Sequence, residues 1–134
     1  MTDILVPISP GELLDKITIL RIKSVRIADA AKLANVRLEL SRLEQSWTAS
    51  VPAATDLVAE EKELARVNAA LWDIEDQIRD HESEQRFDAG FIELARSVYL
   101  RNDERAAIKR RINLKLASEL VEEKSYRPYR QPGR

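Results

Sequence analysis

Cysteine is absent from this sequence, and glycine is scarce, with 3 residues among 134. Without cysteine, neither a disulfide framework nor a metal site with thiolate ligands can form. No run of about 18 apolar residues occurs, so we expect no membrane-spanning helix. The first residues do not resemble a signal peptide, because no basic segment precedes a short apolar stretch. We therefore expect a soluble protein that works in the cytoplasm.

The residues that are present favour helices. Hydrophobic residues make up 44% of the chain and charged residues 34%, against about 25% charged in an average globular protein. Abundant leucine, alanine, glutamate, arginine and lysine with little glycine is typical of helical bundles. The length suits a single domain with one hydrophobic core.

The formal net charge is −1, but the charges are unevenly spread. Residues 56–88 hold 11 acidic and 4 basic side chains, whereas residues 109–134 hold 8 basic and 3 acidic ones. A basic end could attract nucleic acid or an anionic membrane, but acidic and basic helices packed against each other explain the same asymmetry. We favour the packing interpretation and expect neither nucleic acid nor a membrane as a partner.

The first third of the chain predicts an extended arm followed by two helices. Residues 1–8 are mostly apolar but contain Pro7, which cannot donate to a sheet ladder, so they predict an arm or an edge strand. The run SPGE (residues 9–12) places a capping serine, a proline at the first helical position and a glutamate three residues after the cap. This helix should reach about residue 27 and bend near Asp29 into a second helix that extends through Trp47.

A long helix capped by Thr55 or Asp56 should follow and reach about Glu84. A last helix should run from about Ala89 to about Glu122, and residues 125–134 should form a flexible basic tail. The fold class is therefore all-α, an antiparallel bundle or hairpin of three to four long helices in one domain over residues 1–134, with a short extended N-terminal arm.

The arm has no strand to pair with in a helical domain. It must lie in a groove of its own chain or pair with its copy in a second subunit. We therefore expect a homodimer, and we expect deletion of residues 1–8 to weaken self-association.

Polar side chains interrupt the apolar stripes of the predicted helices. Trp72, Glu75 and Arg79 stack on one side of the long helix, because successive helical residues are about 100° apart. The other polar groups on such stripes include Arg21, Asn68, Asn102, Arg105 and Lys109. A buried ion costs several kcal/mol. The number of polar groups on these stripes therefore needs an explanation.

Three explanations remain open at this point. The polar groups could line a water-accessible pocket whose excess of cations binds a carboxylate, a phosphate or a sugar phosphate. In that pocket Glu75 is the central group suited to act as a general base. Alternatively, the groups satisfy one another within the chain, as Glu75 and Arg79 could do at i,i+4 spacing. They could also form a polar interface between subunits.

No metal or cofactor is expected. Asp73, Asp76 and Asp80 could together hold a divalent ion, but they face away from the apolar stripe, which indicates a solvated surface. His81 has no nucleophile at a spacing that suggests a catalytic triad.

Five motifs carry a resemblance to a known family. They are ISPGELLDKITILRIKSVRI (8–27), KLANV (32–36), LWDIEDQIR (71–79), FIELARSVYLRNDERAAIKRRIN (91–113) and SELVEEKSY (118–126). Together they resemble a family of small bacterial and phage helical proteins of unknown function. Its members occur alone or attached to larger proteins, some of them linked to glycosyl transfer and surface polysaccharides. The resemblance covers nearly the whole chain and implies the fold, without an established activity.

Our first expectation is a helical domain that binds a small anionic or sugar-derived molecule between its helices through Arg21, Asn68, Arg79, Asn102, Arg105 and Lys109. Whether it is an enzyme stays open. The first alternative is a non-enzymatic module for protein interaction or oligomerisation. The second is an enzyme similar to the all-helical chorismate mutases, which also build a pocket rich in arginine and lysine among long helices.

Overall fold

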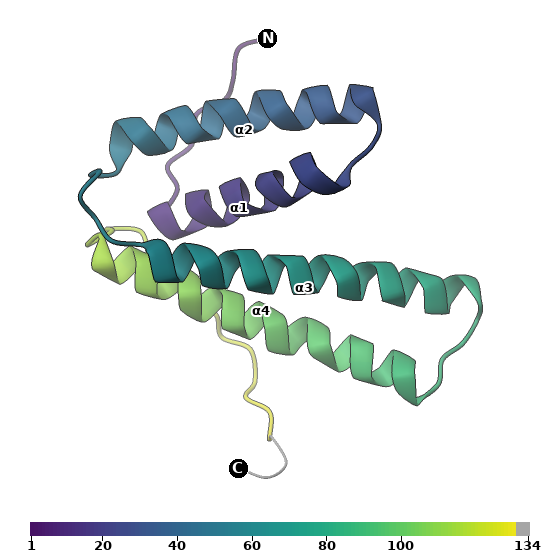
Figure 1. Ribbon diagram of the computed structural model, residues 1–134. Helices are drawn as coiled ribbons and strands as arrows, with labels where there is room; N and C mark the ends of the chain where they lie inside the picture. Colours follow the sequence, from purple (N-terminus) through teal and green to yellow (C-terminus); the bar gives the residue numbers. More distant parts are fainter. Residues whose placement is uncertain (131–134) are drawn as a thin grey trace.

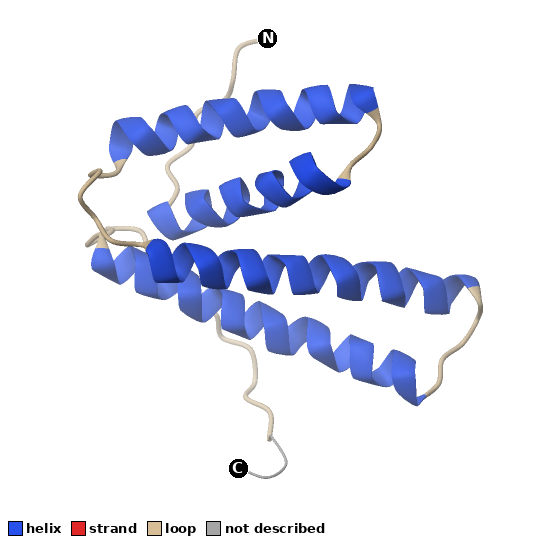
Figure 2. Ribbon diagram, viewed as in Figure 1, coloured by secondary structure: helices blue, strands red, loops and turns tan. Residues whose placement is uncertain are grey.

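The structure, a computed structural model, describes residues 1–130 and contains four helices in this part of the chain. They are α1 (Pro10–Arg26), α2 (Ala30–Ser50), α3 (Val58–Ser83) and α4 (Ala89–Lys115). Figure 2 shows helices and connecting segments, with no strand in the described residues. The all-α prediction with a short N-terminal arm is confirmed. None of these four helices is long and apolar enough to cross a membrane.

Local capping explains where α1 and α2 begin. The Ser9 hydroxyl accepts a hydrogen bond from the backbone N–H of Glu12 at 3.2 Å, and Pro10 takes the first helical position. The Asp29 carboxylate accepts from the backbone N–H of Lys32 at 2.9 Å. Both bonds satisfy N–H groups that a helix start leaves without a partner. The predicted helix start at residues 9–12 and the predicted bend near Asp29 are confirmed.

Two other predicted boundaries need correction. The residue before α3 is Leu57, which makes no side-chain capping bond, although Asp56 accepts from the N–H of Val58 at 3.2 Å. The last helix ends at Lys115 rather than near Glu122. It ends there because Ala117 turns into the left-handed region, with φ 51°.

The turn at Ala117 closes the end of α4 with backbone bonds. The N–H of Ser118 donates to the carbonyl of Asn113 at 2.9 Å, and the N–H of Ala117 donates to that of Leu114 at 3.2 Å. This is a Schellman motif, in which a left-handed residue lets the chain turn back and satisfy the last carbonyls. Residues 118–130 then return along α4, where Glu123 contacts Arg110 at 3.3 Å. Residues 131–134 of the predicted tail lie outside the described residues.

Helix α1 is the central element of the packing. It contacts all three other helices, whereas α2 packs against α1 alone and α3 pairs with α4 as a long hairpin (Figure 1). The core between them consists of Leu14, Leu57, Leu64, Val67, Ile108 and Ile112. Burying such apolar side chains is the main stabilising contribution to the fold.

The α3–α4 hairpin extends beyond the end of α1 (Figure 1). At that end the Arg26 guanidinium lies 5.8 Å from the centre of the Trp72 ring and 2.6 Å from the Asp73 carboxylate. In the described part of the chain, no third helix covers the portions of α3 and α4 beyond this point.

Candidate functional site

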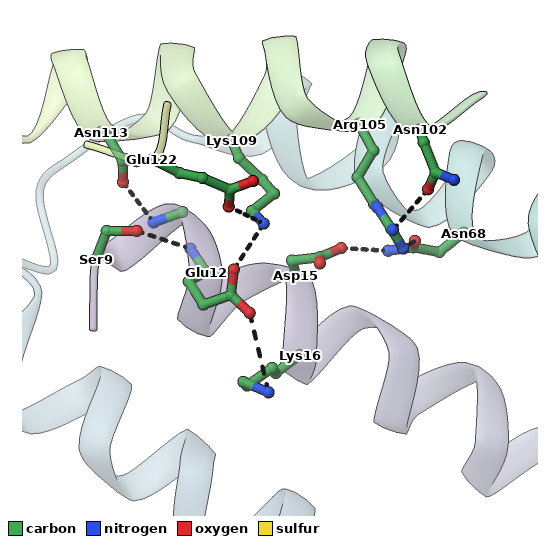
Figure 3. A network of polar contacts seen from close by, with 11 residues as sticks. Ser9, Glu12, Asp15, Lys16, Asn68, Asn102, Arg105, Lys109, Asn113 and Glu122 are labelled. Carbon is green, nitrogen blue, oxygen red and sulfur yellow. Dashed lines mark hydrogen bonds and ion pairs between the residues drawn. The ribbon is translucent and has the colours of Figure 1, made fainter. Parts of the chain in front are cut away.

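Polar side chains from α1, α3, α4 and the C-terminal segment meet at one end of the core (Figure 3). The first contact is between the start of α1 and the end of α4. The N–H of Gly11 donates to the side-chain oxygen of Asn113 at 2.7 Å, and both residues are buried. A Cβ on Gly11 would lie 2.5 Å from the carbonyl oxygen of Lys109. Only glycine therefore lets α1 approach α4 this closely.

Lys109 is the central cation of this network. Its ammonium group donates to the Glu12 carboxylate at 2.6 Å and to the Glu122 carboxylate at 2.9 Å. Burial lowers the pKa of Lys109, but the hydrogen bonds to the two carboxylates raise it by more, so the net shift is upward. The hydrogen bond from Lys109 lowers the pKa of Glu122. Both groups are thus held in their charged forms.

A second branch of the network lies beside Lys109. The buried Asn68 side chain donates to the buried Asp15 carboxylate at 2.8 Å. The Arg105 guanidinium donates to the Asn68 oxygen at 3.3 Å and to the Asn102 oxygen at 2.7 Å. This branch connects α1, α3 and α4 through side chains that satisfy one another.

The structure brings together four of the predicted site residues, namely Asn68, Asn102, Arg105 and Lys109. Their environment differs from the predicted one. The two cations face the carboxylates of Glu12, Asp15 and Glu122, so the expected excess of positive charge is absent. The sequence prediction included the cations on the stripes but not these carboxylates. Glu12 and Asp15 are spaced i,i+3 on α1, and this spacing was the signal for a second polar stripe.

Arg21 lies apart from this network. Its guanidinium contacts Glu61 of α3 and lies 3.4 Å from Glu44 of α2. It lines an open cleft of about 550 Å³ between α1 and α3, in which it is joined by Arg26 and Lys62 around an apolar floor.

Glu75 and Arg79 also lie apart, on the surface of α3 beyond the end of α1. They pair with each other at 3.5 Å, and their side chains are 55% and 77% exposed. The structure therefore does not bring Glu75, Arg79 and Arg21 together with the network residues. Whether Glu75 acts on any ligand stays a prediction.

The cavity next to the network is small and bordered by carboxylates. It measures about 280 Å³ and is lined by Ser9, Glu12 and Glu122 together with Pro7, Ile8, Leu120 and Val121. The cations of the network do not line it. No cluster of three or more histidine, aspartate or glutamate side chains in residues 1–130 is arranged to hold a metal ion.

The fold and the network define a class: a small all-helical domain whose helices are joined by a polar network of their own side chains. Within that class, the chain belongs to DUF6165, described as a family of unknown function, which residues 4–132 match. No curated protein and no solved structure matches the chain.

Proposed function

We propose that this protein is a non-enzymatic module that assembles through its apolar surface, and that the polar network holds its helices in register. The observation that carries the proposal is that Lys109 and Arg105 are already bound by side chains of the same chain. The proposal includes a bacterial or phage source and a cytoplasmic location, in line with the sequence resemblance and the composition.

Ligand binding in the network would require breaking these contacts. An anion that reached Lys109 would have to displace Glu12 or Glu122, leaving a carboxylate without its partner. Removing one member of these partly buried ion pairs is unfavourable because the other charge stays behind without its partner. An enzyme similar to the chorismate mutases would need several cations converging on one ligand, whereas Arg21 and Arg79 lie in other places. These contacts favour a structural role for the network.

The apolar surface supports the assembly part of the proposal. Ile4, Leu5 and Val6 of the arm are 75%, 91% and 65% exposed. Phe87 and Ile92 at the far end of the hairpin are also exposed. Contiguous exposed apolar residues are typical of protein interaction surfaces. The network supports such a role by holding α1 against the hairpin in one arrangement, as buried polar groups do in some assemblies.

The test combines sedimentation velocity with thermal unfolding in the presence of phosphosugars, nucleotides and dicarboxylates. We expect an assembly larger than the 15.3 kDa chain and no rise in the unfolding midpoint with these anions. We expect Lys109→Met to lower stability by about 1–3 kcal/mol, because Glu12 and Glu122 lose their donor. Arg79→Met is the matched control and should change little, since its side chain is 77% exposed. A monomer at every concentration would overturn the proposal, as would an anion-induced rise in the midpoint that Lys109→Met abolishes.

A second candidate function is the binding of a small anion with an apolar body in the cleft beside Arg21. The observation that favours it is an apolar floor in a cleft of about 550 Å³, a size within the range of ligand pockets. Arg21 and Arg26 at this cleft are paired with Glu61 and Asp73, so Lys62 is the cation that an anion would contact without displacing a carboxylate. Thermal unfolding with a medium-chain fatty acid tests it. A rise in the midpoint that Lys62→Met removes would support this candidate, and no rise would refute it.

A further inference from the structure

Residues 1–8 form an extended arm whose backbone has no backbone hydrogen-bond partner within the described residues. The arm contacts the body of the protein through Asp3, whose carboxylate lies 2.6 Å from Arg42 of α2. Both side chains are about half exposed, and exposed ion pairs of this kind contribute little. The arm is thus an extended segment without strand pairing, and its apolar side chains are exposed to water.

An open groove separates the arm from the body. It measures about 640 Å³ and is lined on the body side by Leu13 of α1, Leu43 of α2 and Leu116 after α4. From the arm it is lined by Ile4, Leu5, Val6, Pro7 and Ile8. Ile4 and Val6 share one side of the extended arm, because alternate residues point the same way, and Leu5, which also lines the groove, is the most exposed of the three at 91%. The groove and the arm together offer an apolar surface and a free strand edge.

We propose that the partner on this surface is a second copy of the chain, with residues 3–7 of the two arms paired antiparallel over the two grooves. This inference rests on the proposed assembly function and names its partner. Each copy supplies the same strand and the same groove, which is the self-complementarity that a two-fold dimer requires. Five residues span about 17 Å, the usual length of a strand.

The sequence of the arm favours one register. Antiparallel pairs alternate between hydrogen-bonded and non-hydrogen-bonded positions. If Leu5 lies opposite its copy in a non-hydrogen-bonded pair, then Pro7 lies opposite Asp3 in another such pair. The missing N–H of Pro7 then costs no ladder bond. In the same register Ile4 lies opposite Val6, which places apolar cross-strand pairs over the grooves.

The chain exposes more surface than a compact protein of its mass. The accessible surface of the chain is 9648 Å², whereas a compact monomer of 15.3 kDa should expose about 7,100 Å². The arm and the returning C-terminal segment contribute to this excess. A standard interface needs about 800 Å² from each partner.

The apolar residues at the far end of the hairpin are a weaker basis for a dimer. The Phe87 ring packs edge-on against Phe91, with 5.2 Å between ring centres. Tyr99 packs against Tyr129 of its own chain at 5.1 Å. By contrast, Ile4, Leu5 and Val6 of the arm do not cover one another, because their exposed fractions are 75%, 91% and 65%.

Sedimentation equilibrium of the full chain and two variants tests the dimer. The wild type should be a dimer of about twice 15.3 kDa. Val6→Asp should raise the dissociation constant at least tenfold by placing a charge over the groove, with unchanged helix content by circular dichroism. Val25→Asp is the matched control, an equally small apolar residue on α1 that is 84% exposed and lies outside the groove. It should leave the dissociation constant unchanged.

A disulfide test reports on the register of the two arms. Because the chain has no cysteine, Leu5→Cys introduces a single thiol. Facing residues of a non-hydrogen-bonded pair are close enough for a disulfide after small adjustments, so mild oxidation should give a covalent dimer. Val25→Cys should stay monomeric on a denaturing gel.

The outcomes separate the two proposals. A monomeric wild type would overturn both the dimer and the assembly function. A wild-type dimer that survives Val6→Asp and gives no covalent dimer with Leu5→Cys would overturn the arm pairing alone. In that case another surface, such as the far end of the hairpin, forms the assembly.

Discussion

Gly11→Ala tests the contact between α1 and α4 most sharply. The added Cβ would lie 2.5 Å from the Lys109 carbonyl oxygen and 2.8 Å from the side-chain oxygen of Asn113. The first of these atoms is backbone, so the two helices must move apart. The movement would also break the buried hydrogen bond from the Gly11 N–H to Asn113, which is 2.7 Å long.

The expected loss of stability follows from three contributions. Overpacking costs about 1–3 kcal/mol, and a buried polar group left without its partner costs about 1–3 kcal/mol. Alanine returns about 0.5–1 kcal/mol through its better helix preference. With central values for each, Gly11→Ala should lower the free energy of unfolding by about 3 kcal/mol.

Urea unfolding followed by circular dichroism measures this loss, and Gly90→Ala is a matched control. Both glycines are the second residue of their helices. A Cβ on Gly90 would meet side-chain atoms, the Asp88 carboxylate at 3.2 Å and the His81 ring at 3.4 Å. These can move, so Gly90→Ala should change stability by less than about 1 kcal/mol. If Gly11→Ala were as stable as the wild type, the close approach of α1 and α4 would be wrong.

Three further predictions concern the turn after α4, the ion pairs of two carboxylates, and the exposed residue Glu75. Ala117→Gly should stabilise the protein by about 1 kcal/mol in urea unfolding, because it relieves an alanine held at φ 51°; a loss of stability would contradict the turn. The Lys115 ammonium forms an ion pair with the buried Glu60 carboxylate at 2.6 Å and lowers its pKa, as Lys109 lowers the pKa of Glu122. These two carboxylates therefore contribute stability above the unfolded pKa of about 4.3, and this stability is lost as the pH falls through their lower folded values. Unfolding midpoints between pH 7 and pH 2 measure this loss, and Glu60→Gln should reduce it; an unchanged acid dependence would contradict the ion pair. Glu75→Gln should change the free energy of unfolding by less than about 0.5 kcal/mol, as expected for an exposed side chain; a larger loss would place Glu75 in a structural contact.

Local signals in the sequence were sufficient for the starts of α1 and α2. The capping residues Ser9 and Asp29 accept hydrogen bonds from N–H groups three residues away, so both partners of each bond lie close together in the sequence. The end of α4 depends on the rest of the fold. Residues 118–123 are compatible with a helix. Ala117 does not indicate a helix end, as a glycine at this position would. The chain turns there and is held along α4 by contacts such as Glu122 to Lys109.

Helical periodicity identified part of the network for a related reason. It shows which side of a helix faces the core, and Asn68, Arg105 and Lys109 do lie on that side. It does not show how far the neighbouring helix extends. Because α1 ends at Arg26, opposite Trp72, the side of α3 that is covered at Asn68 is exposed at Glu75. This difference could not be read from the spacing of residues within α3.

The most direct test of the central claim, that the network is a structural unit satisfied by its own side chains, is a double-mutant cycle between Glu12 and Lys109. Stabilities of Glu12→Gln, Lys109→Met and the double variant give their coupling free energy, and a cycle on the exposed pair of Glu75 and Arg79 is the control. We expect a coupling of about 1–2 kcal/mol for Glu12 and Lys109, within the range of contacting residues in one network, against about 0.3–0.5 kcal/mol for the exposed pair. A coupling near zero for Glu12 and Lys109 would contradict the account and return the network to the role of a ligand site.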